Sequence, residues 1–246
     1  MGAIQYNFKR VEEKYFLSRR QYAYLLPRLA GLFAADEYGK TAICNIYYDT
    51  EDWHLIRTSI AKPVYKEKLR VRSYGVPKEN GTVFAELKKK YDGVVYKRRI
   101  KTDAAHVGAL LKSDAPAPGA SQVEREILWF QQFYQAKPKV FIGYDRTAYF
   151  GRADAKLRVT FDENLRYRQE DLDLRAGDGG FPLLDDDPIL MELKLPGVCP
   201  LPLCRMLSEV GAYPVSFSKY GRFYTDYILK QKPQNSVLQK EALPSA

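Results

Sequence analysis

Long stretches of this sequence alternate between apolar and ionic residues with a period of two. This is the pattern of β-strands that turn one face toward a core. The alternation covers residues 8–16, 42–49, 64–74, 82–90, 94–101, 139–150, 156–168 and 189–195. Turn residues separate several of these segments, and Asp92-Gly93 is a strong two-residue hairpin signal between two of them. So many neighbouring strands restrict the chain to a fold built on a large antiparallel sheet.

Helical periodicity occupies several of the intervening segments. It covers residues 19–33, 51–59, 104–112, 122–135, 201–210 and 219–230. Ser18 and Ser218 are the expected N-caps of the first and last of these helices. Pro27 is expected to kink or end the first helix. Together the segments predict an α+β chain: an antiparallel β-barrel or tunnel, closed or nearly closed, with helices packed outside it.

The chain is expected to form one domain over residues 1–230. Residues 231–246 are polar and contain two prolines, so they predict a disordered C-terminal tail. Three cysteines are too few for a disulfide scaffold and indicate a reducing, cytoplasmic location. No apolar run approaches the ~20 residues of a membrane span. The two histidines lie far apart and exclude most histidine-rich zinc sites.

The polar faces of the predicted strands are strongly cationic. Like charges directly opposite each other on neighbouring strands destabilise a sheet. Two of them ~4 Å apart repel by about 4 kcal/mol at an effective dielectric near 20. A barrel whose ionic interior is wet or filled by an anion tolerates this repulsion, whereas a solvated outer face is the alternative for any single run. The cations on these faces are Arg10, Lys14, Lys66, Lys68, Arg70, Arg72, Lys88, Lys90, Lys97, Arg99, Arg146, Arg158, Lys194 and Lys219.

An anionic partner also follows from the net charge of +9. Three carboxylates, Glu12, Glu86 and Glu192, share the cationic faces. A hard divalent cation takes oxygen ligands and bridges them to phosphate, so these residues indicate a phosphoryl-transfer site. A local ion pair with a neighbouring base is the alternative for each carboxylate. Aromatic residues are not interleaved with the charges, which argues against a nucleic-acid partner.

A series of short motifs, in order along residues 8–228, resembles the VTC domain. This is the polyphosphate-polymerase domain of the vacuolar transporter chaperone complex, and it also occurs as a free-standing bacterial protein. The motifs are RVEEKY (residues 10–15), YYDT (47–50), KLRVRSYG (68–75), ELKKK (86–90), VYKRR (95–99), YDRTAY (144–149), LRVTFD (157–162), MELK (191–194) and SFSKY (216–220).

The resemblance implies a triphosphate tunnel metalloenzyme that uses Mn²⁺ or Mg²⁺. Its implied reaction transfers the γ-phosphate of ATP to a growing polyphosphate chain and releases ADP, so ATP and polyphosphate are the expected partners. The implied catalytic residues are Lys14, Arg70, Arg72, Lys88, Lys97, Arg146, Arg158 and Lys219. The expected substrate-binding residues are Arg10, Lys68, Lys90, Arg99, Lys194 and Ser218. Glu192 is the expected metal ligand, with Glu86 and Glu12 as further candidates.

One departure bears on the reaction. The related CYTH hydrolases begin with a Glu-x-Glu-x-Lys strand, and here the first of these positions is Arg10. The change removes a candidate metal ligand and favours a polymerase over a triphosphatase. A tunnel-fold triphosphatase and a non-catalytic polyanion-binding protein remain the alternatives. The length leaves no room for the family's regulatory SPX domain or membrane helices, which predicts a stand-alone catalytic domain.

Overall fold

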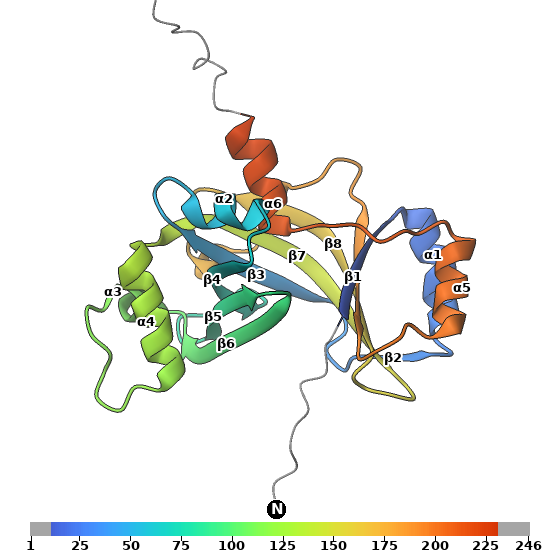
Figure 1. The fold of residues 1–246 in the computed structure, drawn as a ribbon, viewed down its shortest axis with the longest axis horizontal. Helices are drawn as coiled ribbons and strands as arrows, with labels where there is room; N and C mark the ends of the chain where they lie inside the picture. The colour runs from blue at the N-terminus through green and yellow to red at the C-terminus, as the bar shows by residue number, and fades with distance from the viewer. Residues whose placement is uncertain (1–10, 231–246) are drawn as a thin grey trace, which may run out of the picture.

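The computed structural model describes residues 11–230, which form a curled antiparallel sheet with helices around it (Figure 1). The strands are β1 (Val11–Leu17), β2 (Phe33–Ala35), β3 (Thr41–Asp49), β4 (Tyr65–Tyr74), β5 (Thr82–Tyr91), β6 (Val94–Asp103), β7 (Lys137–Gly151), β8 (Arg158–Arg168), β9 (Phe181–Pro182) and β10 (Ile189–Leu195). The helices are α1 (Arg19–Leu29), α2 (His54–Ile60), α3 (Val107–Lys112), α4 (Gln122–Tyr134), α5 (Leu201–Glu209) and α6 (Lys219–Phe223). A 3₁₀ turn (Leu174–Ala176) and a π-helical segment (Tyr224–Leu229), which directly follows α6, complete the list.

The sheet runs in the order β1-β10-β8-β7-β3-β4-β5-β6, with β2 paired to β7 and β9 to β8. This confirms the predicted α+β architecture and the eight long strands. The two short strands, β2 and β9, have too few residues to show alternation and were not predicted. The expected start of the first strand and Arg10 lie outside the described residues, as do the rest of residues 1–10 and the predicted tail 231–246.

Full closure of the barrel is not observed. Within residues 11–230, β1 and β6 end the sheet and no strand pairing joins them. The edge strand β6 carries four cations, Lys97, Arg98, Arg99 and Lys101. Charged side chains on an edge strand disfavour further pairing. The sheet is therefore an open, tunnel-like curl rather than a closed barrel.

The outer face of the sheet is apolar and lies beneath helices. The outer sides of β1, β8 and β10 pack against α1 and α5, with Phe161, Met191 and Leu203 fully buried. The outer sides of β3, β4 and β5 pack against α3 and α4 through residues such as Leu69 and Phe130. Two separate cores thus hold opposite parts of the curled sheet, and both leave its inner face free for polar groups.

The ends of the first helix agree with its sequence signals. The Ser18 hydroxyl accepts a hydrogen bond from the Gln21 backbone N–H, and the Gln21 side chain accepts one from the Ser18 N–H. This reciprocal capping box satisfies two backbone donors at the helix start. Pro27 lies near the end of α1, which stops at Leu29 rather than continuing to residue 33.

A third core covers one end of the inner face. Here α2 and α6 pack over β3 and β7, and Tyr47, Ile142, Tyr220 and Phe223 are buried between them. Figure 1 shows α6 beside α2 at this end of the sheet. The lining of the inner face therefore changes from apolar to ionic at the first turn of α6. No helix in residues 11–230 has the length and apolar character needed to cross a membrane.

Candidate functional site

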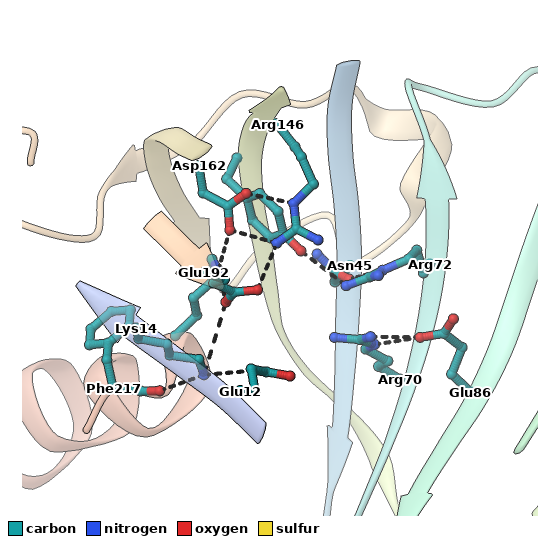
Figure 2. Close-up of polar contacts among 12 residues, drawn as sticks. Glu12, Lys14, Asn45, Arg70, Arg72, Glu86, Arg146, Asp162, Glu192 and Phe217 are labelled. Atoms are coloured by element: carbon teal, nitrogen blue, oxygen red, sulfur yellow. Dashed lines mark hydrogen bonds and ion pairs between the residues drawn. The ribbon is translucent and has the colours of Figure 1, made fainter. Parts of the chain in front are cut away.

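Charged side chains from several strands converge on the inner face of the sheet (Figure 2). The period of two in β4 explains the placement: Leu69 and Val71 are buried in the outer core, whereas Arg70 and Arg72, which alternate with them, point inward. The same alternation places Lys14 and Glu192 opposite each other on β1 and β10. The predicted ionic interior is thus confirmed for the described residues.

Asp162, on β8, organises the centre of the site. Its carboxylate is fully buried and accepts two hydrogen bonds from Arg146, at 2.6 and 2.7 Å. Lys219, the first residue of α6, donates a third at 2.6 Å. This two-pronged geometry fixes the Arg146 guanidinium, and the carboxylate holds the Lys219 ammonium in place. Burial lowers the pKa of Lys219, but Asp162 and Glu192 outweigh it and raise the pKa.

Sequence reasoning did not assign Asp162 to the site. It belongs to the LRVTFD motif and continues the inward alternation after Arg158 and Thr160, so the period of two was the signal that could have identified it. Asn45 and Tyr144 were also missed. Their side chains bind the Arg72 guanidinium at 2.8 and 3.0 Å and hold it in position.

Glu192 is bound more loosely than Asp162. Its oxygens lie 3.2 Å from Arg146, 3.4 Å from Lys219 and 3.9 Å from Lys14. Burial raises the pKa of Glu192, but Lys219 and Arg146 outweigh burial and lower it well below its usual value. The carboxylate is therefore ionised, and its contacts with these cations are longer than those that Asp162 makes with Arg146 and Lys219.

Both oxygens of the Glu86 carboxylate lie close to cations. Arg70 donates two hydrogen bonds to it, at 2.8 and 2.7 Å, and Lys97 lies 2.7 Å from its other oxygen. Burial raises the pKa of Glu86, but Arg70 and the nearby cations outweigh it and lower the pKa to about 2. Glu12 lies 3.5 Å from Lys14. Both of these carboxylates form the local ion pairs that were the alternative to metal binding.

Four lysines form an uncompensated row on the inner face of β4 and β5. Lys66 lies opposite Lys90, and Lys68 lies opposite Lys88. Among the described residues, none of these four makes an ion pair with a carboxylate. Burial and the neighbouring cations Lys66 and Lys88 lower the pKa of Lys68 to about 7. The row, called the lysine row below, therefore repels itself in the free protein.

The lysine row leads to solvent. A pocket of about 460 Å³ lies at its end, lined by Lys62, Lys66, Lys90 and Ser216 among others. At the other end of the row, the Lys68 Nζ lies 3.4 Å from the Ser218 hydroxyl. Ser218 is confirmed as the N-cap of α6, because its hydroxyl accepts a hydrogen bond from the Gly221 N–H.

The remaining predicted residues lie at the borders of the inner face. Arg158 on β8 lies opposite Lys194 on β10, and its guanidinium stacks on the Phe150 ring at 4.1 Å. Arg99 on β6 lies opposite Glu86 and stacks on Phe84 at 4.7 Å. The structure thus brings the predicted site residues that it describes onto the inner face or the start of α6.

The donor set fits a divalent cation that is held mainly by its own water and by phosphate. Within residues 11–230 no three acidic, histidine or cysteine side chains form a ready metal cluster. A single loosely paired carboxylate, Glu192, supplies a hard oxygen ligand. Mg²⁺ keeps several waters and binds through one or two carboxylates together with substrate phosphates. Glu192 would therefore hold such an ion only when an anion also supplies oxygens.

Fold and site together define an α+β class in which a curled antiparallel sheet encloses an ionic interior. The model of the VTC domain matches residues 9–225, and the chain belongs to this family. Subunit 4 of the vacuolar transporter chaperone complex from Schizosaccharomyces pombe is 26% identical over 209 residues. The match covers 72% of this chain and 28% of that subunit, so the chain spans less than a third of this relative's length.

Two solved structures with a similar arrangement of strands and helices are both described as putative adenylyl or adenylate cyclases. A putative adenylyl cyclase from Hippeastrum, described as having a dominant triphosphatase activity, matches with a TM-score of 0.48 and 17% identity over 88% of this chain and 95% of that chain. A putative adenylate cyclase from Vibrio parahaemolyticus matches with a TM-score of 0.47 and 11% identity over 87% of this chain and 97% of that chain.

Proposed function

We propose that this protein is an ATP-dependent polyphosphate polymerase. It would transfer the γ-phosphate of ATP to the end of a polyphosphate chain on its inner face and release ADP. Membership of the VTC family supports this proposal, as does the polyanion-binding chemistry of the site. Arginine suits two-pronged contact with phosphate, and lysine supplies a mobile point charge. The cytoplasmic location stays a prediction from the cysteines.

The fixed arginines would orient the reacting phosphates. Arg146 is held by Asp162, Arg70 by Glu86, and Arg72 by Asn45 and Tyr144. Phosphoryl transfer depends on positioning and on neutralising the charge on the phosphoryl oxygens, with little covalent chemistry for the protein to perform. Preorganised cations meet this requirement because they do not have to move during the reaction. A Mn²⁺ or Mg²⁺ ion held by Glu192 would add further neutralisation of the phosphate charge.

The length of the cationic stretch on β4, which includes the lysine row, is the observation that carries the choice of a polymerase. From Lys66 to Arg72, β4 presents inward cations over six residue steps, roughly 20 Å of strand. This length exceeds a triphosphate, and a solvent-open pocket lies at its lysine end, beside Lys66 and Lys90. A chain of linked phosphates would reach from the fixed arginines to the lysine row. A substrate of three phosphates bound at the arginines would leave the lysine row without a counter-ion.

A triphosphatase is the second candidate. The feature that favours it is the apolar core in which Tyr220 and Phe223 of α6 cover one end of the inner face, since a blocked end suits a short substrate. In that reaction water would accept the phosphoryl group. Binding of a polyanion without catalysis is the third reading, and it would use the same cations.

The test uses the purified chain with γ-labelled ATP and either Mn²⁺ or Mg²⁺, and a gel that separates polymer from phosphate. A ladder of labelled polymer would support the polymerase, and labelled phosphate alone would identify a triphosphatase. Glu192→Gln should remove the product in either case. If the wild-type protein gives neither product but still binds polyphosphate, the binding-protein reading replaces both.

A matched pair of lysine variants tests the route of the chain. Lys88→Ala changes the inner face of β5, whereas Lys89→Ala changes its outer face, where Lys89 lies 3.8 Å from Glu126. We expect Lys88→Ala to shorten the polymer and Lys89→Ala to leave its length unchanged. Equal product lengths in both variants would contradict a polymer path along the lysine row.

A further inference from the structure

Thr160, the third residue of β8, carries a buried hydroxyl with no hydrogen-bond partner among the described residues. The residue is 6% exposed. A buried polar group without a partner carries the full desolvation cost of that group, so such groups in native proteins call for an explanation. Its alternation with Arg158 and Asp162 places Thr160 on the inner face.

The neighbours of Thr160 in the sheet explain which ligand the hydroxyl can reach. On one side it lies directly opposite Glu192 of β10, and on the other side opposite Ala148 of β7, which has no polar side chain. Directly opposite residues in an antiparallel pair have Cβ atoms about 5 Å apart. The Glu192 carboxylate extends across β8 to Arg146 on β7, at 3.2 Å, and so passes beside Thr160.

We propose that Thr160 Oγ1 is the second protein oxygen of the divalent-cation site at Glu192. This proposal rests on the proposed function of that site. A hydroxyl oxygen is a hard ligand of the kind that Mg²⁺ and Mn²⁺ accept. Arg146 and Lys219, the cations beside Glu192, already donate short hydrogen bonds to Asp162. The Thr160 hydroxyl therefore stays available to another ligand. One carboxylate and one hydroxyl leave the other coordination positions to water and phosphate.

The experiment measures Mn²⁺ binding rather than turnover. Free Mn²⁺ is followed by electron paramagnetic resonance as it is titrated into the full chain saturated with inorganic triphosphate. Thr160→Val removes the hydroxyl at nearly constant shape, and Thr160→Ser keeps it. Thr147→Val makes the same change on the outward side of β7, where Thr147 lies opposite Phe161. We expect Thr160→Val to weaken Mn²⁺ binding by at least about tenfold, the smallest loss typical when a residue that only supports a metal ligand is removed. Thr160→Ser and Thr147→Val should bind as the wild-type protein does.

Two further measurements separate the explanations. In the absence of metal, Thr160→Val should bind triphosphate with wild-type affinity and should melt at the same or a higher temperature, because a methyl group replaces an unpartnered hydroxyl. Weaker triphosphate binding without metal would mean that the hydroxyl contacts phosphate, and would overturn the proposal. Unchanged Mn²⁺ affinity in Thr160→Val, or no Mn²⁺ uptake by the wild-type protein, would also overturn it. The readout needs no turnover, so it can succeed even where the polymerase assay fails.

Discussion

At the scale of single residues, the site contains two kinds of cation. Arg146 and Lys219 have short contacts with a buried carboxylate, whereas Lys68 lies near other cations, a hydroxyl and the Tyr220 ring and makes no ion pair within residues 11–230. The first kind is held in place before any ligand arrives. The second kind lacks a counter-ion in the free protein, and an anionic ligand would supply one. Substitutions at the two kinds should therefore have opposite effects on the stability of the free protein.

Replacing Lys68 by methionine should stabilise the free protein and weaken its response to anions. The substitution removes a partly buried charge that is repelled by Lys66 and Lys88. We expect a higher melting temperature without ligand and a smaller rise on addition of inorganic triphosphate. Lys89→Met on the outer face serves as the control and should leave the triphosphate response unchanged. A lower melting temperature in Lys68→Met without ligand would contradict self-repulsion within the lysine row.

The lowered pKa of Lys68 also sets a pH dependence. The pKa of Lys68 is about 7 in the folded chain, whereas its ordinary value is 10.5. Below pH 7 both the folded and the unfolded chain hold this proton, whereas between pH 7 and 10.5 only the unfolded chain binds it. Stability rises with pH wherever the unfolded state binds more protons. The urea midpoint of the wild-type protein should therefore rise relative to that of Lys68→Met between pH 7 and 9. A constant difference would contradict the shift.

Removing the buried carboxylate should have the opposite effect. Asp162→Asn leaves Arg146 and Lys219 without their short anionic partner. Removal of one partner of a buried ion pair typically destabilises a protein by about 3–5 kcal/mol. We expect a loss of this order in urea unfolding, partly reversed by inorganic triphosphate, which can bind the freed cations. If Asp162→Asn unfolded at the same urea midpoint as the wild-type protein in the absence of ligand, Asp162 would not hold these cations.

At the scale of elements, α6 joins the site to the apolar core. Lys219 reaches Asp162, and the next residue, Tyr220, donates a hydrogen bond to Asp49 at 2.8 Å. Asp49 ends β3 and also accepts from the Leu55 and Ile56 backbone N–H groups at the start of α2, at 2.9 Å each. Asp49 therefore ties α2 and α6 to the sheet and fixes where Lys219 enters the site.

Tyr220→Phe tests this docking. It removes the hydrogen bond to Asp49 and keeps the ring, which stacks on Tyr47 at 4.6 Å between centroids. We expect a loss of about 1.5–3 kcal/mol in unfolding free energy, the net value of a hydrogen bond to a charged group. Triphosphate affinity should also fall, because Lys219 is the adjacent residue. Tyr224→Phe is the matched control: the buried Tyr224 hydroxyl has no hydrogen-bond partner in the described part of the chain, so its removal should not destabilise the protein. Equal losses in both variants would argue against the Asp49 contact.

At the scale of the whole molecule, the excess of positive charge and the open curl of the sheet act together. A net charge of +9 destabilises a compact chain through self-repulsion and attracts anions to the inner face. Inorganic triphosphate at ~100 times its dissociation constant should raise the unfolding free energy by about 2.7 kcal/mol. The gain should diminish as NaCl is added, since salt screens exposed charges. No rise in melting temperature with saturating triphosphate would contradict a preformed phosphate site.

The sequence alone was enough to predict which residues face inward. The side-chain period of a strand is exactly two, so any strand with one apolar face in a core must send its charges to the other face. This placed Arg70 and Arg72, Lys14 and Glu192 correctly before their partners were known. The sequence also located the eight long strands and the N-caps Ser18 and Ser218, because alternation and capping residues are local signals in the chain.

Only the tertiary structure decided which charges meet and how the sheet ends. Asp162 pairs with Lys219 across 57 positions of sequence, and no local pattern encodes such a contact. The same holds for α6 over the inner face and for the unpaired edges β1 and β6 in the described part of the chain. These features depend on long-range packing, in which the placement of each strand and helix is settled by the elements around it. The sequence therefore determined the chemistry of the inner face, and the fold determined which of its groups are paired and which are left for a ligand.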